Sequence, residues 1–236
     1  MAAPQRPTVQ LYHAEVAAFD TSDWGRLVTA EDLAALPLTA HPRRRAEHLA
    51  GRALLRVALE AWTGRPALSH RLRVAATGKP ECVDGPELSV AHSRGAVVCA
   101  LGPEGAIGID IELPVPGRAV DGIGERYFSA EESRWADDQP DRFYMLWVLK
   151  EAYLKALGVG LAGGLDALCC EIEPPLIEAT VRGSAEVPAL ALYGAASGFI
   201  GVATFCRRAA DVTAFRWAPG EPLSSTPLRL VARTIE

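Results

Sequence analysis

Alternating apolar and polar residues predict a strand over 107–112, which reads IGIDIE. The three isoleucines share one face, and Gly108, Asp110 and Glu112 share the other, because successive strand side chains point to opposite sides. Two acids in an otherwise apolar strand fit either a half-exposed polar face or a metal site. Side chains two apart on a strand are separated by roughly 6.6 Å, so both carboxylates can reach one cation. The strand alone leaves the two explanations open.

Helical spacing and end signals predict two long helices. The first covers 42–62, with a proline near its start and Gly64 just after its end. The second covers 143–157 and ends before Gly158. A shorter helix is expected after Ser129, where S-x-x-E forms a capping-box pattern.

Short apolar runs bounded by turn residues predict further strands. They cover 8–15, 87–93, 95–101, 189–193 and 199–205. The last two are interpreted as a buried hairpin rather than a membrane span, because glycine and proline interrupt them. Strands joined by short turns indicate mainly antiparallel sheets packed with helices, an α+β fold. The order strand, helix, strands occurs twice, so we expect two similar halves, residues 1–104 and 105–236.

One side of the second long helix is polar. Trp147, Glu151 and Lys155 follow one another at intervals of four residues, and Lys150 lies at the edge of their face. Considered alone, a solvated Glu151–Lys155 pair accounts for this pattern. Placed beside the two acids of the strand, a third carboxylate and two lysines would give Mg²⁺ its oxygen ligands and phosphate its counter-charges.

Charge and cysteine content exclude several classes of protein. The net charge of −5 gives no overall attraction to nucleic acid or to an anionic membrane. The five cysteines are odd in number and form no C-x-x-C pair, so neither a disulfide framework nor a zinc site is expected. The first residues lack the pattern of a signal peptide. A cytoplasmic protein with no nucleic-acid or membrane partner is the expectation.

The two acidic motifs together resemble the signature of the 4′-phosphopantetheinyl transferases of the surfactin-synthetase-activating type. GIDIE is followed along the chain by WVLKEAYLK, and every signature position is filled. These positions are Gly108, Asp110, Glu112, Trp147, Lys150, Glu151, Ala152 and Lys155. The similarity covers residues 77–161 and includes the GKP turn that contains Lys79.

Enzymes of that family move the phosphopantetheine arm of coenzyme A onto a serine of an apo carrier protein and release 3′,5′-ADP. The resemblance implies an active site between the two halves, with Asp110, Glu112 and Glu151 as Mg²⁺ ligands. Asp110, Glu151 and Lys155 are then the catalytic residues, with Glu151 as the base that deprotonates the carrier serine. Lys150 and Lys155 would neutralise the leaving phosphate.

The resemblance also implies contacts to the other phosphates of coenzyme A. They fall on Arg44, Arg52, Lys79 and His92. Two neighbours of His92 depart from the family pattern: Ser89 replaces the usual asparagine, and Ala91 replaces the usual serine. No phosphate contact is therefore expected from residue 91.

A monomer acting on acyl or peptidyl carrier proteins of polyketide, non-ribosomal peptide or fatty-acid synthesis is implied. The proline- and glycine-rich loop 113–124 is a candidate carrier surface, with Arg118, Arg126, Tyr127 and Phe128 as contacts. The alternative for the two aromatic residues is that they belong to the core. A non-catalytic binding module would be expected to have lost an acid, and a different phosphotransferase would need a phosphate-binding loop that is absent.

Overall fold

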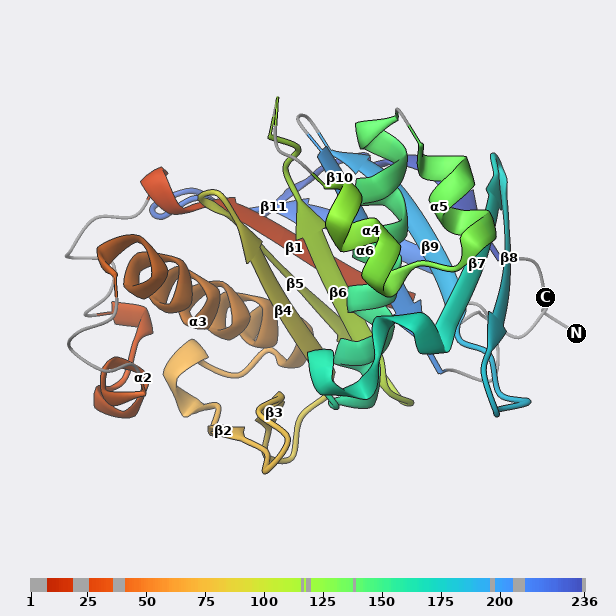
Figure 1. Cartoon of the computed structure of the whole chain (residues 1–236). Coiled ribbons are helices and arrows are strands. Elements are labelled where there is room, and N and C mark those ends of the chain that lie inside the picture. Colours follow the sequence, from red (N-terminus) through yellow and green to blue (C-terminus); the bar gives the residue numbers. More distant parts are fainter. Residues whose placement is uncertain are drawn as a thin grey trace, which may run out of the picture.

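The computed structural model describes residues 8–18, 26–35, 41–115, 117, 120–137, 139–195, 198–205 and 211–234. Within these ranges the chain is α+β, with two large sheets that each pack against a long helix (Figure 1). No helix in them is long and apolar enough to cross a membrane. The cysteines they include, Cys82, Cys99, Cys169 and Cys170, are free thiols, and Cys206 lies outside them.

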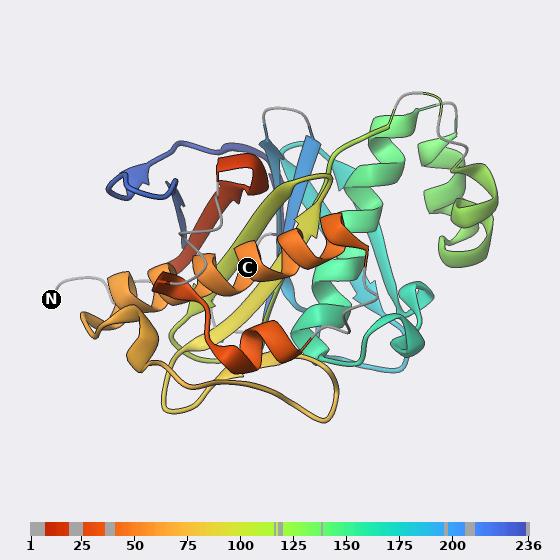
Figure 2. The same cartoon turned by 90° about the vertical axis from the view of Figure 1, so that its left-hand side faces the viewer.

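The first sheet has the strand order β12-β11-β1-β5-β4. Its strands are β12 Ser224–Ser225, β11 Asp211–Arg216, β1 Thr8–Glu15, β5 Ala96–Gly102 and β4 Glu87–Ser93. Helix α3, Pro42–Thr63, lies across one face of this sheet (Figure 2). Beside α3 lie the short helix α2, Ala30–Ala34, and the hairpin of β2, Leu72–Val74, and β3, Pro80–Cys82.

The second sheet has the order β6-β10-β9-β13-β8-β7. Its strands are β6 Ile107–Glu112, β10 Gly198–Thr204, β9 Ala189–Ala195, β13 Arg229–Arg233, β8 Leu176–Val181 and β7 Leu168–Glu173. Helix α6, Pro140–Leu157, covers its outer face together with α4, Asp121–Tyr127, and α5, Ala130–Ala136. Short 3-10 helices are η1 Val16–Ala18, η2 Ala67–Ser69, η3 Leu161–Gly163 and η4 Leu165–Ala167.

Three apolar clusters fix the layers. One joins α3 to the first sheet, and one joins α4, α5 and α6 to the second sheet. The third contains side chains of both sheets, among them Leu11, Val98, Ile109 and Val202. The layers therefore run from α3 through the first and second sheets to α6.

Most predicted elements are confirmed. Helix α3 extends the predicted helix by one residue, and both long helices end at a left-handed glycine, Gly64 or Gly158. The hairpin of β9 and β10 is confirmed, and the sheets are mainly antiparallel, although β1–β11 and β13–β8 pair in parallel. The first sheet includes β11 and β12 from beyond residue 104, so it combines strands from both of the predicted ranges.

The candidate carrier loop needs a correction. Its last part is helical, because α4 begins at Asp121. Phe128 is a buried core residue with its ring 5.2 Å from that of Phe143, and Tyr127 packs edge-on against Trp147. Arg118 lies outside the described residues.

Candidate active site

Strand β6 brings its acidic face against helix α6. A Cβ atom at Gly108 would lie 1.8 Å from the carbonyl oxygen of Ala152, so only glycine allows the strand and helix backbones to meet there. Gly201 of β10 has the same role, with a Cβ position 2.4 Å from the oxygen of Val148. This close packing places Asp110 and Glu112 beside the Glu151 and Lys155 face of α6.

Asp110 is a buried carboxylate with one engaged oxygen. Its Oδ1 accepts a hydrogen bond from Nζ of Lys155 at 2.6 Å, and it is 5% exposed. Its Oδ2 is buried and has no hydrogen-bond partner among the described residues. Burial raises the pKa of Asp110, and Lys155 opposes that rise. A buried, unpartnered carboxylate oxygen is costly, so it marks a place where a cation would be favourable.

Glu112 and Glu151 complete a group of three acids. Glu112 accepts a hydrogen bond from Oγ of Ser93 at 2.9 Å. The pKa of Glu151 is raised to about 7, mainly by burial; the charges of Asp110 and Glu112 contribute to the rise, and Lys155 opposes it. The carboxylates of Asp110 and Glu112 are therefore close enough to Glu151 to repel its charge.

The donor set of these acids suits magnesium. Mg²⁺ prefers carboxylate oxygens, and a bound cation would relieve the repulsion and satisfy Oδ2 of Asp110. Within the described ranges, however, no three His, Cys, Asp or Glu side chains already converge as a metal cluster. Lys155 instead supplies the positive charge nearest to Asp110.

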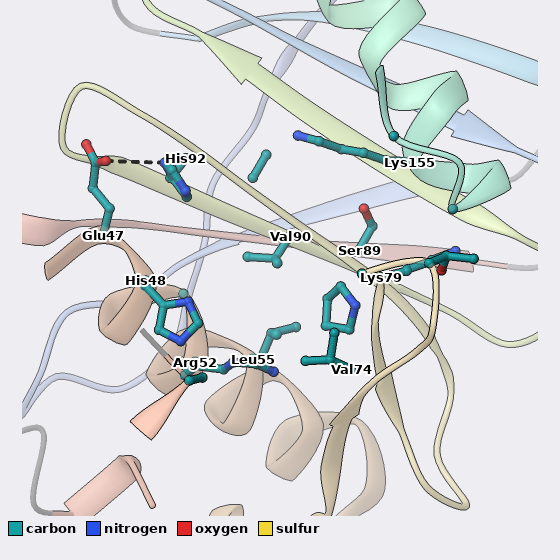
Figure 3. A pocket seen from close by; sticks show the side chains of 18 residues that line it. Glu47, His48, Arg52, Leu55, Val74, Lys79, Ser89, Val90, His92 and Lys155 are labelled. Atoms are coloured by element: carbon teal, nitrogen blue, oxygen red, sulfur yellow. Dashed lines mark ion pairs between the residues drawn. The ribbon is translucent and has the colours of Figure 1, made fainter. Parts of the chain in front are cut away.

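A cavity of about 530 Å³ (Figure 3) is lined in part by Lys155, whose Nζ also bonds to Asp110 of this acidic group. Its walls come from α3, β4, the turn between β2 and β3, and the C-terminal end of α6. Of the predicted coenzyme A contacts, Arg52, Lys79, His92 and Lys155 line it. The prediction thus identified residues that are distant in sequence and share one cavity.

The two arginines predicted on α3 differ in their surroundings. Arg52 is buried, with Nε 3.6 Å from Asp32 Oδ1, and its Nη1 has no partner among the described residues. Nε2 of His48, which also lines the cavity, is similarly buried without a partner there. Arg44 is exposed, although its charge contributes to lowering the pKa of His92. Of these two arginines, only Arg52 is part of the cavity wall.

The structure does not bring Lys150 to the cavity. Its ammonium is fully buried, 2.9 Å from Oε2 of Glu132, and donates to the carbonyl oxygens of Leu165 and Leu168. The ring of Phe128 lies on another side, 5.5 Å from Nζ. Lys150 is one position from Glu151, so its side chain leaves the helix in a different direction and cannot face the same ligand.

Lys79 lines the cavity but directs its ammonium to the protein. Nζ donates to the carbonyl oxygens of Ile107 at 3.0 Å and Ala156 at 3.1 Å, and lies 3.9 Å from Glu87. Burial lowers the pKa of Lys79. It thereby connects the turn between β2 and β3 to both β6 and the end of α6.

Sequence reasoning missed three acidic residues that support the site. Asp32 holds Arg52 and Arg56 on α3, Glu47 contacts His92, and Glu132 neutralises Lys150. The T-x-x-D capping box of α2 was a readable signal for Asp32. Ser89, the departure from the family pattern, accepts a hydrogen bond from the backbone of Ile109 and so joins the edges of the two sheets.

The part of the chain that contains β6 and α6 resembles known proteins. Residues 106–187 match the family model of the 4′-phosphopantetheinyl transferase superfamily. A putative 4′-phosphopantetheinyl transferase of Synechocystis, slr0495, is 31% identical over 149 residues, which are 59% of this chain and 61% of that protein.

Two further relatives carry related names. The 4′-phosphopantetheinyl transferase Sfp of Bacillus subtilis is 38% identical over 97 residues, which are 38% of this chain and 42% of Sfp. The human L-aminoadipate-semialdehyde dehydrogenase-phosphopantetheinyl transferase is 31% identical over 146 residues, covering 53% of this chain and 47% of its own length. The chain thus aligns with less than two thirds of each of these relatives. The segment that matches the superfamily model, residues 106–187, contains both β6 and α6.

Proposed function

We propose that the protein transfers the 4′-phosphopantetheine arm of coenzyme A to a serine of an apo carrier protein. The observation that carries this proposal is the cavity lined by Arg52, His92 and Lys155 beside the carboxylates of Asp110 and Glu151. The cationic side chains can bind a ligand with several phosphates, and the carboxylates can bind a metal ion or act as a general base. The names of the aligned relatives support the same chemistry.

Coenzyme A would occupy the cavity with its phosphates toward these cations. Arg52, with its unpartnered Nη1, is the proposed contact for the 3′-phosphate, and Arg44 adds charge from the exposed start of α3. His92 and Lys155 are the proposed contacts for the pyrophosphate. Lys79 has a supporting role, because a direct phosphate contact would require breaking its bonds to two carbonyl oxygens.

Asp110, Glu112 and Glu151 are the proposed Mg²⁺ ligands. Bound there, Mg²⁺ would neutralise the pyrophosphate and make its phosphorus a better electrophile. Lys155 donates a hydrogen bond to Asp110, so its ammonium lies close to the proposed site of the metal and the pyrophosphate. Lys150 would act from behind α6, by holding the helix against α5 and η4.

The proposed reaction is one displacement at phosphorus. The carrier serine gives its proton to Glu151, which is the proposed general base. The serine oxygen forms a bond to the phosphorus attached to pantetheine, and the bond from that phosphorus to the oxygen of the 3′,5′-ADP group breaks. Lys155 donates a hydrogen bond, and finally a proton, to the leaving phosphate oxygen.

The finer architectural predictions belong to this proposal. We propose two related halves that act as a monomer, with the active site between them. The N-terminal range 1–104 would supply the contacts to coenzyme A, and the range 105–236 the metal ligands and the catalytic helix. The supporting observation is that the cavity wall combines residues of α3 and β4 with Lys155, Gly158 and Gly160.

Mass spectrometry of carrier proteins tests the proposed activity. Apo carriers of the polyketide, non-ribosomal peptide and fatty-acid types would be incubated with the protein, coenzyme A and Mg²⁺. The expected result is a mass gain of one phosphopantetheine arm on at least one of them, at the serine. A carrier without that serine is the control. No mass gain on any of the three types would contradict the proposal.

A separate prediction concerns the 3′-phosphate. Arg52→Gln is expected to weaken coenzyme A binding about tenfold more than dephospho-coenzyme A binding, because a charge-assisted hydrogen bond of roughly 1.5 kcal/mol or more is lost. Arg44→Gln should give a smaller difference, since Arg44 is exposed. Calorimetry with the two ligands measures both effects. Substitution of the exposed Arg134 of α5 by Gln is the control and should not change binding of either ligand. Equal weakening of both ligands by Arg52→Gln would show that Arg52 does not contact the 3′-phosphate.

A further inference from the structure

The cavity wall contains a buried acid that the proposed reaction does not use. Glu47 of α3 is 7% exposed and lines the cavity close to His92. Figure 3 shows the two side chains facing each other, with Oε2 of Glu47 3.3 Å from Nδ1 of His92. A negative charge is unexpected in the wall of a site for a ligand with several phosphates, since the two repel each other.

The carboxylate of Glu47 is fixed from two other sides. Its Oε1 accepts hydrogen bonds from the backbone nitrogen of Gly95 and from Nε of Arg43, both at 3.0 Å. Gly95 belongs to the turn between β4 and β5, where Arg94 and Gly95 have positive φ angles of 50° and 90°. Glu47 thus joins α3 to the hairpin that contains His92, and its charge is held at the edge of the imidazole ring.

This contact determines which ring nitrogen can meet a ligand. A carboxylate can only accept hydrogen bonds, so the nearby Glu47 favours the tautomer of His92 with a proton on Nδ1. Nε2 lies on the other side of the ring and is directed away from Glu47. The imidazole can therefore present Nε2 to the cavity without turning, in the way that a carboxylate orients histidine in other active sites.

Several charges surround His92. Glu47 and Arg44 face it from α3, Lys155 from α6 and Asp110 from β6. Burial is the largest influence and lowers the pKa of His92, and Lys155 and Arg44 lower it too, while Glu47 and Asp110 raise it. The ring is accordingly neutral at neutral pH without ligand, and a phosphate group arriving beside it would favour the protonated form.

We propose that Glu47 is a positioning residue for coenzyme A, which holds Nδ1–H of His92 so that Nε2 faces the cavity and takes up a proton as a phosphate group binds. The inference rests on the proposed function. The direction in which neutralising Glu47 changes the affinity for coenzyme A tests it. If Glu47 only lined the cavity, neutralising it would remove repulsion and tighten binding; if it acts through His92, neutralising it weakens binding.

The decisive variant is Glu47→Gln, which keeps the size of the side chain and an acceptor for Gly95. Calorimetry of coenzyme A binding in two buffers of different ionisation enthalpy gives both the dissociation constant and the number of protons taken up. We expect proton uptake by the wild-type protein at a pH of about 7.5, loss of most of that uptake in Glu47→Gln, and a dissociation constant raised about tenfold. In a His92→Gln background, Glu47→Gln should weaken binding no further.

Glu15→Gln is the matched control. Glu15 is an exposed acid at the end of β1, in the same sheet as His92, so its neutralisation should leave proton uptake and affinity within about twofold of the wild-type values. The ring nitrogens of ¹⁵N-labelled His92 in the ligand-free wild-type protein give a second measurement, which does not depend on whether the variant folds. The Nδ1-protonated tautomer is expected there.

The outcomes separate the inference from the function on which it rests. A wild-type protein that does not bind coenzyme A overturns the proposed function. A wild-type protein that binds coenzyme A, together with a Glu47→Gln variant that binds it equally well or more tightly, overturns the inference alone. The Nε2-protonated tautomer of His92 in the ligand-free protein would also overturn it.

Discussion

Asp110→Asn is expected to reduce the transfer rate about a thousandfold, because a charged metal ligand contributes several kcal/mol to stabilising a phosphoryl transition state. The substitution keeps the shape of the side chain and removes a buried charge whose Oδ2 has no partner among the described residues. The melting temperature should therefore not fall. Rates would be followed by mass spectrometry of the carrier protein, and Mg²⁺ binding by calorimetry.

The control for Asp110 is an exposed acid of the same sheet. Glu171 lies on β7 with its side chain in solvent, so Glu171→Gln should leave both rate and Mg²⁺ binding unchanged. A near-normal rate for Asp110→Asn at saturating Mg²⁺ would show that Asp110 is not a metal ligand. A folded variant that has lost the rate but still binds Mg²⁺ with normal affinity would also exclude Asp110 as a ligand, and would leave it a role toward Lys155.

Lys150→Met should lower the free energy of unfolding by about 3–5 kcal/mol, which is the usual cost of leaving one member of a buried ion pair without its partner. Glu132 is only 3% exposed and would keep its charge in an apolar site. The carbonyl oxygens of Leu165 and Leu168 would also lose their donor. Urea unfolding followed by circular dichroism measures the change.

A second variant distinguishes a structural Lys150 from a phosphate ligand. Adding Glu132→Gln to Lys150→Met removes the unpaired charge, although the single carbonyl oxygen of glutamine can accept a hydrogen bond from only one of the backbone nitrogens of Ser129 and Cys170. Part of the lost stability should return, and the KM for coenzyme A should stay close to the wild-type value. A Lys150→Met protein of normal stability but with a strongly raised KM would restore the interpretation of Lys150 as a phosphate contact.

Local patterns were sufficient to predict the main elements. The proline at the start of α3 and the glycine after it are signals that act within a few residues, so the helix was predicted almost to its ends. Strand β6 was predicted from alternation, and the reason for its glycine emerged only with the helix that packs on it. Asp110 of the first motif and Lys155 of the second lie in direct contact.

The parts that were missed depend on contacts across long stretches of chain. The sequence placed Lys150 at the edge of the polar face of α6. Its ion-pair partner is Glu132, which the sequence had explained only as a helix-capping residue. Glu132 in fact serves both purposes at once. The contacts of Asp32 with Arg52 and of Glu47 with His92 could not be predicted from sequence. Each joins residues far apart in the chain, and a local pattern does not show which elements will pack together.

Strand β1 has a consequence for how the chain folds during synthesis. It pairs with β5 on one edge and with β11, near the other end of the chain, on the opposite edge. Until residues 211–216 leave the ribosome, that second edge of β1 has unpaired backbone groups, which is the condition under which strands of different nascent chains join. The first sheet can therefore be completed only after strands β6 to β10 of the second sheet have been synthesised.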